Sequence, residues 1–208
     1  MGSCNGLLCF SQSRFKIRYR DHIYLLNRGT REFKELSYAP CSNYNAPLVG
    51  LGFDPMSKDY KFFKIGYYNR LGDKPTILQT DVWLYSLNSN NWRKFGDIPI
   101  PDLYFLDSST PVVNATIHWM ISRKNSLGSL SSSIFSLEVV DEVFRELPQP
   151  PEHGCYRDIA VMGGCLSVFY EGGHDSTEIW VMKESSSPNL FSDSLVSFAL
   201  LLEDDWTP

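Results

Sequence analysis

The sequence predicts an all-β protein built from repeated β-propeller blades, and two observations support this fold class. Short apolar runs alternate with polar residues between turn residues, and no window keeps the i, i+3, i+4, i+7 spacing of an amphipathic helix. Three of these runs open segments that share one pattern of residue types. Units of short strands that recur every 45 to 59 residues are typical of propeller blades.

The shared pattern is a hairpin that opens at Ile23, Val82 and Ile134. In each copy an aromatic residue stands ten positions later, a basic residue follows it, and an apolar residue stands at position thirteen. These residues are Phe33, Lys34 and Leu36, then Trp92, Arg93 and Phe95, then Phe144, Arg145 and Leu147. We expect two short strands around a polar turn, with the aromatic ring facing the same core as the apolar residues of the first strand.

A second hairpin precedes each copy and completes a four-stranded unit. Its turn is longest in the second unit, at residues 54–59, and in the others it consists of Asn5-Gly6, Asn114-Ala115 or Gly163-Gly164. Asn and Gly suit two-residue turns because they adopt positive φ readily. A fourth unit opens at Ile179, but Asn189 stands at its position ten, without an aromatic and basic pair. We therefore expect three to four antiparallel blades in an incomplete ring.

Composition excludes several classes of partner and location. The net charge of -5 and the pI near 5.4 disfavour binding to nucleic acid, which requires a concentrated basic field. The N-terminal residues have no basic or apolar signal region, and the longest apolar run, 195–202, is too short to span a membrane. Five cysteines without a C-x-x-C pair are typical of reduced thiols. We expect a cytoplasmic or nuclear protein that does not bind membranes.

Several segments resemble one family of interaction domains. They are Gly2-Ser-Cys-Asn-Gly-Leu-Leu-Cys, Gly52-Phe-Asp-Pro, Val82-Trp-Leu-Tyr-Ser-Leu, Phe144-Arg-Glu-Leu-Pro and Ile179-Trp-Val-Met-Lys-Glu. Together they resemble the F-box-associated interaction domain of plant F-box and F-box/kelch-repeat proteins. The resemblance implies a kelch-like propeller over residues 1–184, followed by a divergent tail at 185–208. It also implies the substrate-recognition part of an SCF-type ubiquitin ligase receptor, whose partner is an unidentified target protein.

The same resemblance limits which partners are expected. The F-box that binds a Skp-type adaptor in this family is not found in the sequence, so we expect that adaptor only in longer relatives that carry it. The family's pattern also ends after residue 184. A non-functional truncated fragment therefore remains an alternative to an interaction module.

Candidate binding residues follow from the direction of the strands. In an antiparallel four-stranded blade, the loop between the second and third strands and the connection to the next blade leave the same face. Tyr and Arg are enriched at protein-interface hot spots, and ten aromatic or arginine residues fall in these segments. They are Tyr19, Arg20, Tyr44, Tyr67, Tyr68, Arg70, Tyr104, Phe105, Tyr156 and Arg157. Individual members could instead pack back onto neighbouring blades.

No catalytic, cofactor-binding or metal-binding residue is predicted, so we do not expect an enzyme. Cys4 lies in a G-x-C-x-G sequence, but a nucleophile elbow must open a helix, and here a strand follows. The four histidines lack the spacing of a metal site. Kelch-type propellers can host metal-dependent oxidation, which would require a cluster of Tyr, Cys and His that this sequence does not bring together.

Overall fold

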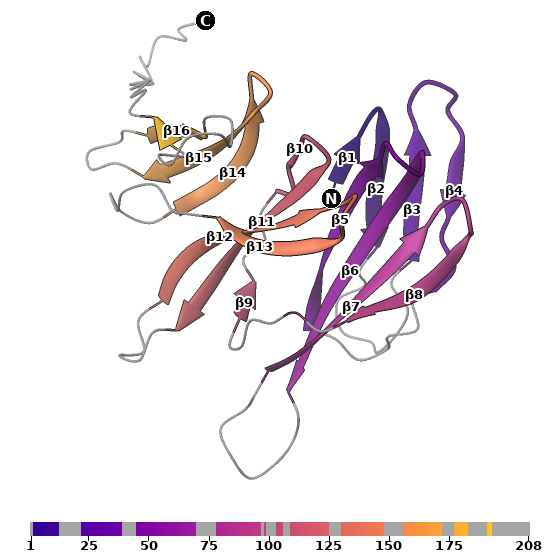
Figure 1. The fold of residues 1–208 in the computed structure, drawn as a ribbon, viewed down its shortest axis with the longest axis horizontal. Coiled ribbons are helices and arrows are strands. Elements are labelled where there is room, and N and C mark those ends of the chain that lie inside the picture. The colour runs from indigo at the N-terminus through magenta and orange to yellow at the C-terminus, as the bar shows by residue number, and fades with distance from the viewer. Residues whose placement is uncertain are drawn as a thin grey trace, which may run out of the picture.

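The computed structural model consists of strands and turns, without a helix, wherever it describes the chain. The described residues are 2–12, 22–38, 45–69, 78–96, 98, 103–105, 109–124, 130–147, 156–171, 177–182 and 191–192. They form four antiparallel sheets in chain order, here called blades 1 to 4 (Figure 1). The predicted fold class, an all-β propeller of four-stranded blades, is confirmed.

Each blade runs from its first strand to its last in sequence order. Blade 1 contains β1 (Gly2–Cys4), β2 (Leu7–Gln12), β3 (His22–Asn27) and β4 (Phe33–Glu35). Blade 2 contains β5 (Asn45–Asp54), β6 (Asp59–Asn69), β7 (Leu78–Ser86) and β8 (Asn91–Gly96). Blade 3 contains β9 (Leu103–Phe105), β10 (Val112–Val113), β11 (Thr116–Lys124), β12 (Leu130–Glu138) and β13 (Val143–Leu147). Blade 4 contains β14 (Tyr156–Met162), β15 (Cys165–Glu171), β16 (Thr177–Met182) and β17 (Phe191–Ser192).

The predicted two-residue turns have the backbone that their residue types favour. Both residues of each turn have positive φ: 48° and 79° at Asn5-Gly6, 48° and 56° at Asn114-Ala115, and 59° and 84° at Gly163-Gly164. Positive φ at both central positions defines the type I′ hairpin turn, whose twist matches the strands that it joins. The turn signals therefore placed the first hairpin of three blades correctly.

The repeat predicted from the sequence is also a repeat of strand register. In blades 1 to 3, the residue three positions after the opening one pairs with the aromatic residue at position ten. The pairs are Leu26 with Phe33, Tyr85 with Trp92, and Leu137 with Phe144. The three hairpins are thus copies of one building block.

The aromatic ring faces the same core as only some apolar residues of the first strand, such as Tyr85 with Trp92 and Leu137 with Phe144, and not the core of the opening residue. Val82, which opens the second copy, packs in the core between blades 2 and 3, whereas Trp92 packs in the core between blades 1 and 2. Side chains alternate between the two faces of a strand, so a residue at position three, with its partner at position ten, lies on the opposite face from position zero. The aromatic residue therefore faces the preceding blade, and the opening residue faces the following one.

The fourth blade is more complete than expected. Met182, three positions after Ile179, pairs with Phe191 in β17, so an aromatic residue does occupy the register position that Trp92 and Phe144 occupy. Phe191 follows Ile179 by twelve positions instead of ten, because the connection between the two strands is two residues longer. A search at fixed spacing misses such an insertion, whereas strand pairing tolerates it. The domain boundary at residue 184 stays a prediction.

Three apolar cores hold neighbouring blades together. In the core between blades 1 and 2, Ile23, Leu25 and Leu36 pack with Phe62 and Trp92. Indole N–H groups add hydrogen bonds across two of the interfaces: Trp92 Nε1 donates to the Ser37 carbonyl at 2.6 Å, and Trp119 Nε1 donates to the Val49 carbonyl at 3.2 Å. Each tryptophan thus connects its own blade to the blade before it.

Candidate protein-interaction surface

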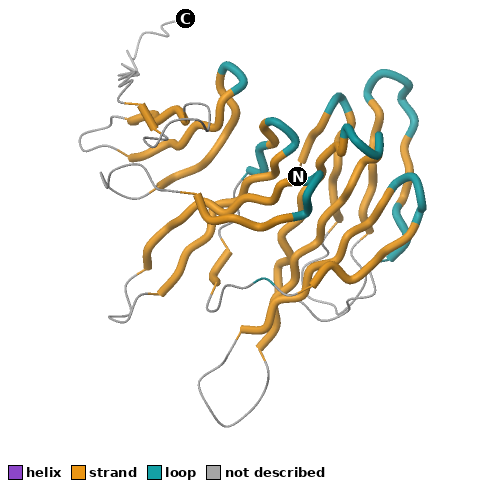
Figure 2. The backbone as a smooth tube through the Cα atoms, in the orientation of Figure 1, coloured by secondary structure: helices purple, strands orange, loops and turns teal. Residues whose placement is uncertain are grey.

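The strand ends divide the molecule into two faces. We call the face with the short turns, among them 5–6, 55–58, 87–90, 114–115 and 163–164, the turn face (Figure 2). The opposite face, where β2 ends and β3 begins in blade 1 and where each blade connects to the next, is called the loop face. Six of the ten candidate binding residues lie in strands that begin or end at the loop face. The other four, Tyr19, Arg20, Tyr44 and Arg70, lie outside the described residues.

The sequence placed Tyr67 and Tyr68 in a loop, but the structure places them in a strand. They lie near the end of the pairing between β6 and β7, where Tyr67 pairs with Thr80 and Tyr68 with Gln79. Aromatic and β-branched residues favour extended backbone, which explains why this hairpin continues beyond the predicted strand ends. The two tyrosines are therefore held on a paired ladder that leads to the loop face.

Tyr104 and Phe105 also lie in a strand that the sequence did not predict. They belong to β9, in which Phe105 pairs with Ile121 and Tyr104 with Ser122. β9 and β10 border the same strand, β11, at different residues, so blade 3 has an interrupted first strand. Pro111 precedes β10, and a proline lacks the N–H that a continuous ladder requires. The pairing places Tyr104 and Phe105 beside the loop-face half of β11.

Tyr156 and Arg157 start β14, which begins at the loop face of blade 4. Tyr156 pairs with Tyr170, and the register shifts between Tyr156 and Asp158, so Arg157 is the extra residue of a β-bulge. Bulges redirect a side chain and are frequent next to functional sites. The six described candidates thus lie at the loop-face ends of β6, β9 and β14, in three different blades. Their role in binding stays a prediction.

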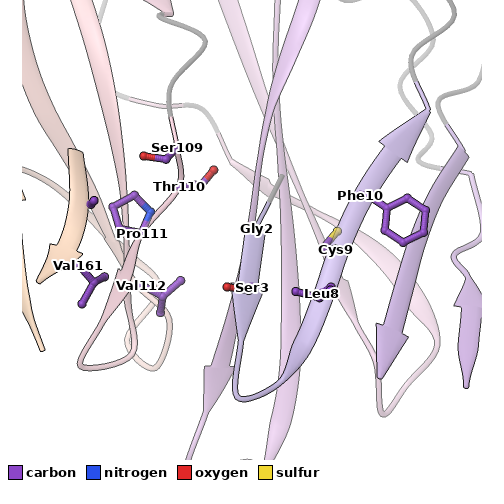
Figure 3. Close-up of a pocket in the computed structure, with 11 residues that line it drawn as sticks. Gly2, Ser3, Leu8, Cys9, Phe10, Ser109, Thr110, Pro111, Val112 and Val161 are labelled. Carbon is purple, nitrogen blue, oxygen red and sulfur yellow. The ribbon is translucent and has the colours of Figure 1, made fainter. Parts of the chain in front are cut away.

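A cavity of about 650 Å³ opens between blade 1 and blades 3 and 4. Figure 3 shows Ser3 and Leu8 of blade 1 on one side of it, with Pro111, Val112 and Val161 on the other. Its walls are mainly aliphatic, and Ser109 at its border donates a 2.8 Å hydrogen bond to Asp158 Oδ1. Such a cavity suits an apolar group with few hydrogen bonds.

The sequence reasoning did not identify the cavity-lining residues. A signal for them existed in Leu7-Leu-Cys-Phe10, where apolar residues occupy both faces of β2. A strand that is apolar on both faces is typically covered on both. Cys9 is 3% exposed, in the core toward blade 2, while Leu8 points to the cavity (Figure 3).

A charged network fixes the turn face between blades 2 and 3. Lys61 Nζ lies 2.9 Å from both Asp54 Oδ2 and Glu142 Oε1 and donates to the Val139 carbonyl at 3.0 Å, while Arg93 also pairs with Glu142. Burial alone would raise the pKa of the Asp54 and Glu142 carboxyls, but the hydrogen bonds that they accept hold both pKa values below the usual range. The network is a structural link between two blades.

The buried titratable groups elsewhere are unsuited to acid–base or thiolate chemistry. Burial raises the pKa of Cys9 to about 12 and also raises that of Cys4, so both thiols stay protonated at neutral pH. Burial lowers the pKa of His118 to about 4, which keeps this side chain neutral beside the Pro111 carbonyl. Within the described residues, no three His, Cys, Asp or Glu side chains gather as a metal site would require. The described part of the chain also contains no helix able to cross a membrane.

The four antiparallel sheets in chain order define a four-bladed propeller domain. A family model described as "F-box associated beta propeller domain" matches residues 1–207. The chain therefore belongs to the F-box associated beta propeller domain family, and the predicted resemblance is confirmed. The matched range continues beyond residue 184, where the sequence comparison of individual segments had ended.

The curated relatives are plant F-box proteins from Arabidopsis thaliana. F-box protein At3g07870 is 33% identical over 205 residues, with 88% of this chain and 47% of that protein covered. F-box/kelch-repeat protein At3g23880 is 26% identical over 191 residues, and F-box protein CPR1 is 24% identical over 210 residues, each with 88% of this chain and 48% of that protein covered. The chain thus spans about half the length of these relatives.

Among solved structures, the fold is similar to Zg3597, a family 117 glycoside hydrolase of Zobellia galactanivorans. The TM-score is 0.48 at 13% sequence identity, over 86% of this chain and 56% of that one. A likeness of this size carries no inference about activity.

Proposed function

We propose that this chain is the substrate-recognition module of an SCF-type ubiquitin ligase receptor, and that it holds a target protein on its loop face. The observation that carries the proposal is membership of a family whose named relatives are F-box proteins. The loop-face ends of β6, β9 and β14, where six candidate residues lie, support the choice of this face. Tyr and Arg contribute disproportionately to binding because they bury large planar side chains at a low cost in conformational entropy.

In this proposal the Skp-type adaptor binds an F-box that longer relatives carry, and the propeller binds the target without catalysing a reaction. It also places the protein in the cytoplasm or nucleus, where such ligases would meet their targets. The neutral His118 and the protonated Cys4 and Cys9 support a binding role over acid–base or thiolate chemistry.

The adaptor half of the proposal is tested with two forms of the protein. The 208-residue chain and the same chain with an F-box fused upstream are each incubated with a purified Skp-type adaptor. We expect the fusion to bind the adaptor and the chain alone to fail. Binding by the chain alone would show that the propeller itself contacts the adaptor, which would contradict the proposal.

The target half is tested by comparing the two faces. Proteins that co-purify with the fusion in plant cells are quantified for the unchanged chain, for a loop-face variant (Tyr67→Ser with Tyr104→Ser) and for a turn-face control, Met56→Ser. Met56 is 81% exposed in the turn between β5 and β6, so its replacement changes an accessible apolar side chain on the opposite face. A target should be lost from the loop-face variant and retained by the control. Retention by both, or loss only from the control, would place recognition elsewhere.

A further inference from the structure

Blade 1 has an apolar face that no described segment covers, although the same face is buried in blade 2. In blade 2 this face carries a row of cross-strand neighbours, Leu51, Phe62, Tyr85 and Trp92, that are 0% to 8% exposed because blade 1 packs on them. The row contributes one residue from each strand and spans the whole width of the blade.

The corresponding row in blade 1 consists of Ser3, Leu8, Leu26 and Phe33. Phe33 is 74% exposed, against 8% for Trp92 at the same register position. Phe10 and Tyr24 lie on the same face, paired across β2 and β3 and stacked with ring centroids 5.5 Å apart. Leu8 and Phe10 also border the cavity described above, so the free face continues into it. A contiguous apolar face of this kind is typical of a protein interface.

The occupant that fits this face can be inferred from the interfaces inside the molecule. What covers the row of blade 2 is the opposite face of blade 1, through Ile23 and Leu25 of β3 and Leu36 behind β4. Position zero and position two of the repeat therefore meet the aromatic row of the next blade. The partner of the free row should be a blade that presents aliphatic residues at those two positions.

Blade 4 presents such a face. Ile179 and Val181 hold positions zero and two of its repeat, and Phe169 pairs with Ile179. They alternate with Val168 and Trp180, which pack toward blade 3, so they point away from blade 3. All three side chains are half-buried. Blades 1 and 4 thus carry complementary halves of the interface that is formed between blades 1 and 2 and between blades 2 and 3.

We propose that the blade 1 face that carries Phe33 binds the blade 4 face that carries Ile179 and Val181 in a second copy of this chain. The contact joins two different surfaces, so copies associate head to tail and not by pairing one surface with itself. Its chemistry is that of the blade 1–blade 2 core, an aromatic row against branched aliphatic residues. The proposal is independent of the target protein that the loop face binds.

The first test is the mass of the purified chain in solution as a function of concentration, measured by light scattering after size exclusion. We expect a mass of at least twice the 23.8 kDa of one chain at high concentration. Phe33→Lys should raise the dissociation constant about tenfold or more, because a buried phenyl side chain is replaced by a charge. Met56→Lys is the matched control, since Met56 is 81% exposed and belongs to the turn face of blade 2. It should leave the mass unchanged.

The second test uses the head-to-tail geometry. Val181→Lys blocks the blade 4 face and leaves the blade 1 face intact, whereas Phe33→Lys does the reverse. Each variant alone should be monomeric, and an equimolar mixture should form a dimer that does not grow further, because only one compatible pair of faces remains. Val181→Ser replaces Val181→Lys if the charged variant does not unfold cooperatively.

The outcomes separate the proposal from its rivals. A monomeric unchanged chain at all concentrations would overturn it, as would dissociation by Met56→Lys to the same extent as by Phe33→Lys. An oligomer that Phe33→Lys disrupts but that Val181→Lys alone leaves intact would indicate a symmetric contact between two blade 1 faces, which also contradicts the head-to-tail assignment.

Discussion

Phe33 and Trp92 occupy the same position in two copies of one building block, yet one is 74% exposed and the other 8%. Trp92 is covered by the preceding blade and donates its indole N–H to the Ser37 carbonyl of that blade. No described blade precedes Phe33. The difference shows that the repeat encodes an interface with the neighbouring blade, so a side chain of this pattern contributes to folding only where that neighbour is present.

The largest expected difference in stability is between removing the ring of Trp92 and removing the ring of Phe33. Trp92→Ala should lower the free energy of unfolding by about 3–5 kcal/mol, because it leaves a cavity in the core between blades 1 and 2. Phe33→Ala should change the same quantity by less than about 0.5 kcal/mol when the chain is monomeric, since the ring is already in water. Urea denaturation in dilute solution measures both. Equal losses would show that Phe33 is covered in the folded monomer.

The second effect concerns the charged link between blades 2 and 3. Lys61→Met should cost about 3 kcal/mol, because it leaves the carboxylates of Asp54 and Glu142 buried without this cation. Lys58→Met, at an exposed turn position, should change stability by less than about 0.5 kcal/mol. A loss no larger in Lys61→Met than in this control would show that the network contributes nothing to the interface.

The same network predicts a dependence on pH. The folded-state pKa values of Asp54 and Glu142 lie below their ordinary values, so their contribution is complete above about pH 5 and is lost as the pH falls through the ordinary carboxyl pKa toward the folded one. The free energy of unfolding should therefore decrease between pH 5 and pH 3. Glu142→Gln should make this decrease shallower. A slope unchanged by that substitution would assign the acid sensitivity to other groups.

A smaller effect tests how closely the blades pack. A methyl group at Gly50 would lie 2.7 Å from a ring carbon of Trp119 and 2.9 Å from a methyl carbon of Ile117 in blade 3, so Gly50→Ala should cost about 1–3 kcal/mol through overpacking. Gly2→Ala in blade 1 has its nearest neighbour at 3.8 Å and should be tolerated. Thermal unfolding of the pair distinguishes them, and equal melting temperatures would contradict the observed approach of β5 to blade 3.

The smallest effect concerns equivalent turn positions. Ala115 has φ of 56°, whereas glycine stands at this position in the turns of blades 1 and 4. Ala115→Gly should stabilise the protein by about 0.5–1 kcal/mol, since the left-handed conformation is strained for alanine, and Gly164→Ala should destabilise it by a similar amount. Denaturation midpoints measure both changes. Destabilisation by Ala115→Gly would mean that the strain of alanine in this turn is smaller than the conformational entropy that glycine loses on folding.

The fold could be predicted because short-range signals determine it. Asn5-Gly6 and Gly163-Gly164 set the hairpin turns, and a constant spacing of ten residues set the register of three outer hairpins. The face to which the aromatic ring at position ten points could also have been predicted. It follows from the alternation of side chains along the first strand and from the pairing of positions three and ten. Phe191 was missed for another reason, because an inserted pair of residues lengthens a connection without changing the strand pairing.

The candidate site was less predictable than the fold. Tyr104 and Phe105 were assigned to a loop because β9 has only three residues, too few to show a periodic pattern in the sequence. Only the pairing with β11 identifies them as a strand. Arg157 likewise becomes distinctive only through the bulge opposite β15. The cavity between blade 1 and blades 3 and 4 depends on how blades are arranged around the axis, which no local pattern specifies.

The central claim is that the aromatic residue at position ten of one blade packs on the residue at position thirteen of the blade before it. Phe144 and Phe95 form this contact between blades 3 and 2, with ring centroids 5.5 Å apart in an edge-to-face arrangement. A double-mutant cycle with Phe95→Leu and Phe144→Leu measures it directly in the free energy of unfolding. The account predicts a coupling of about 0.5–1.5 kcal/mol between the two rings. Strictly additive effects would contradict it.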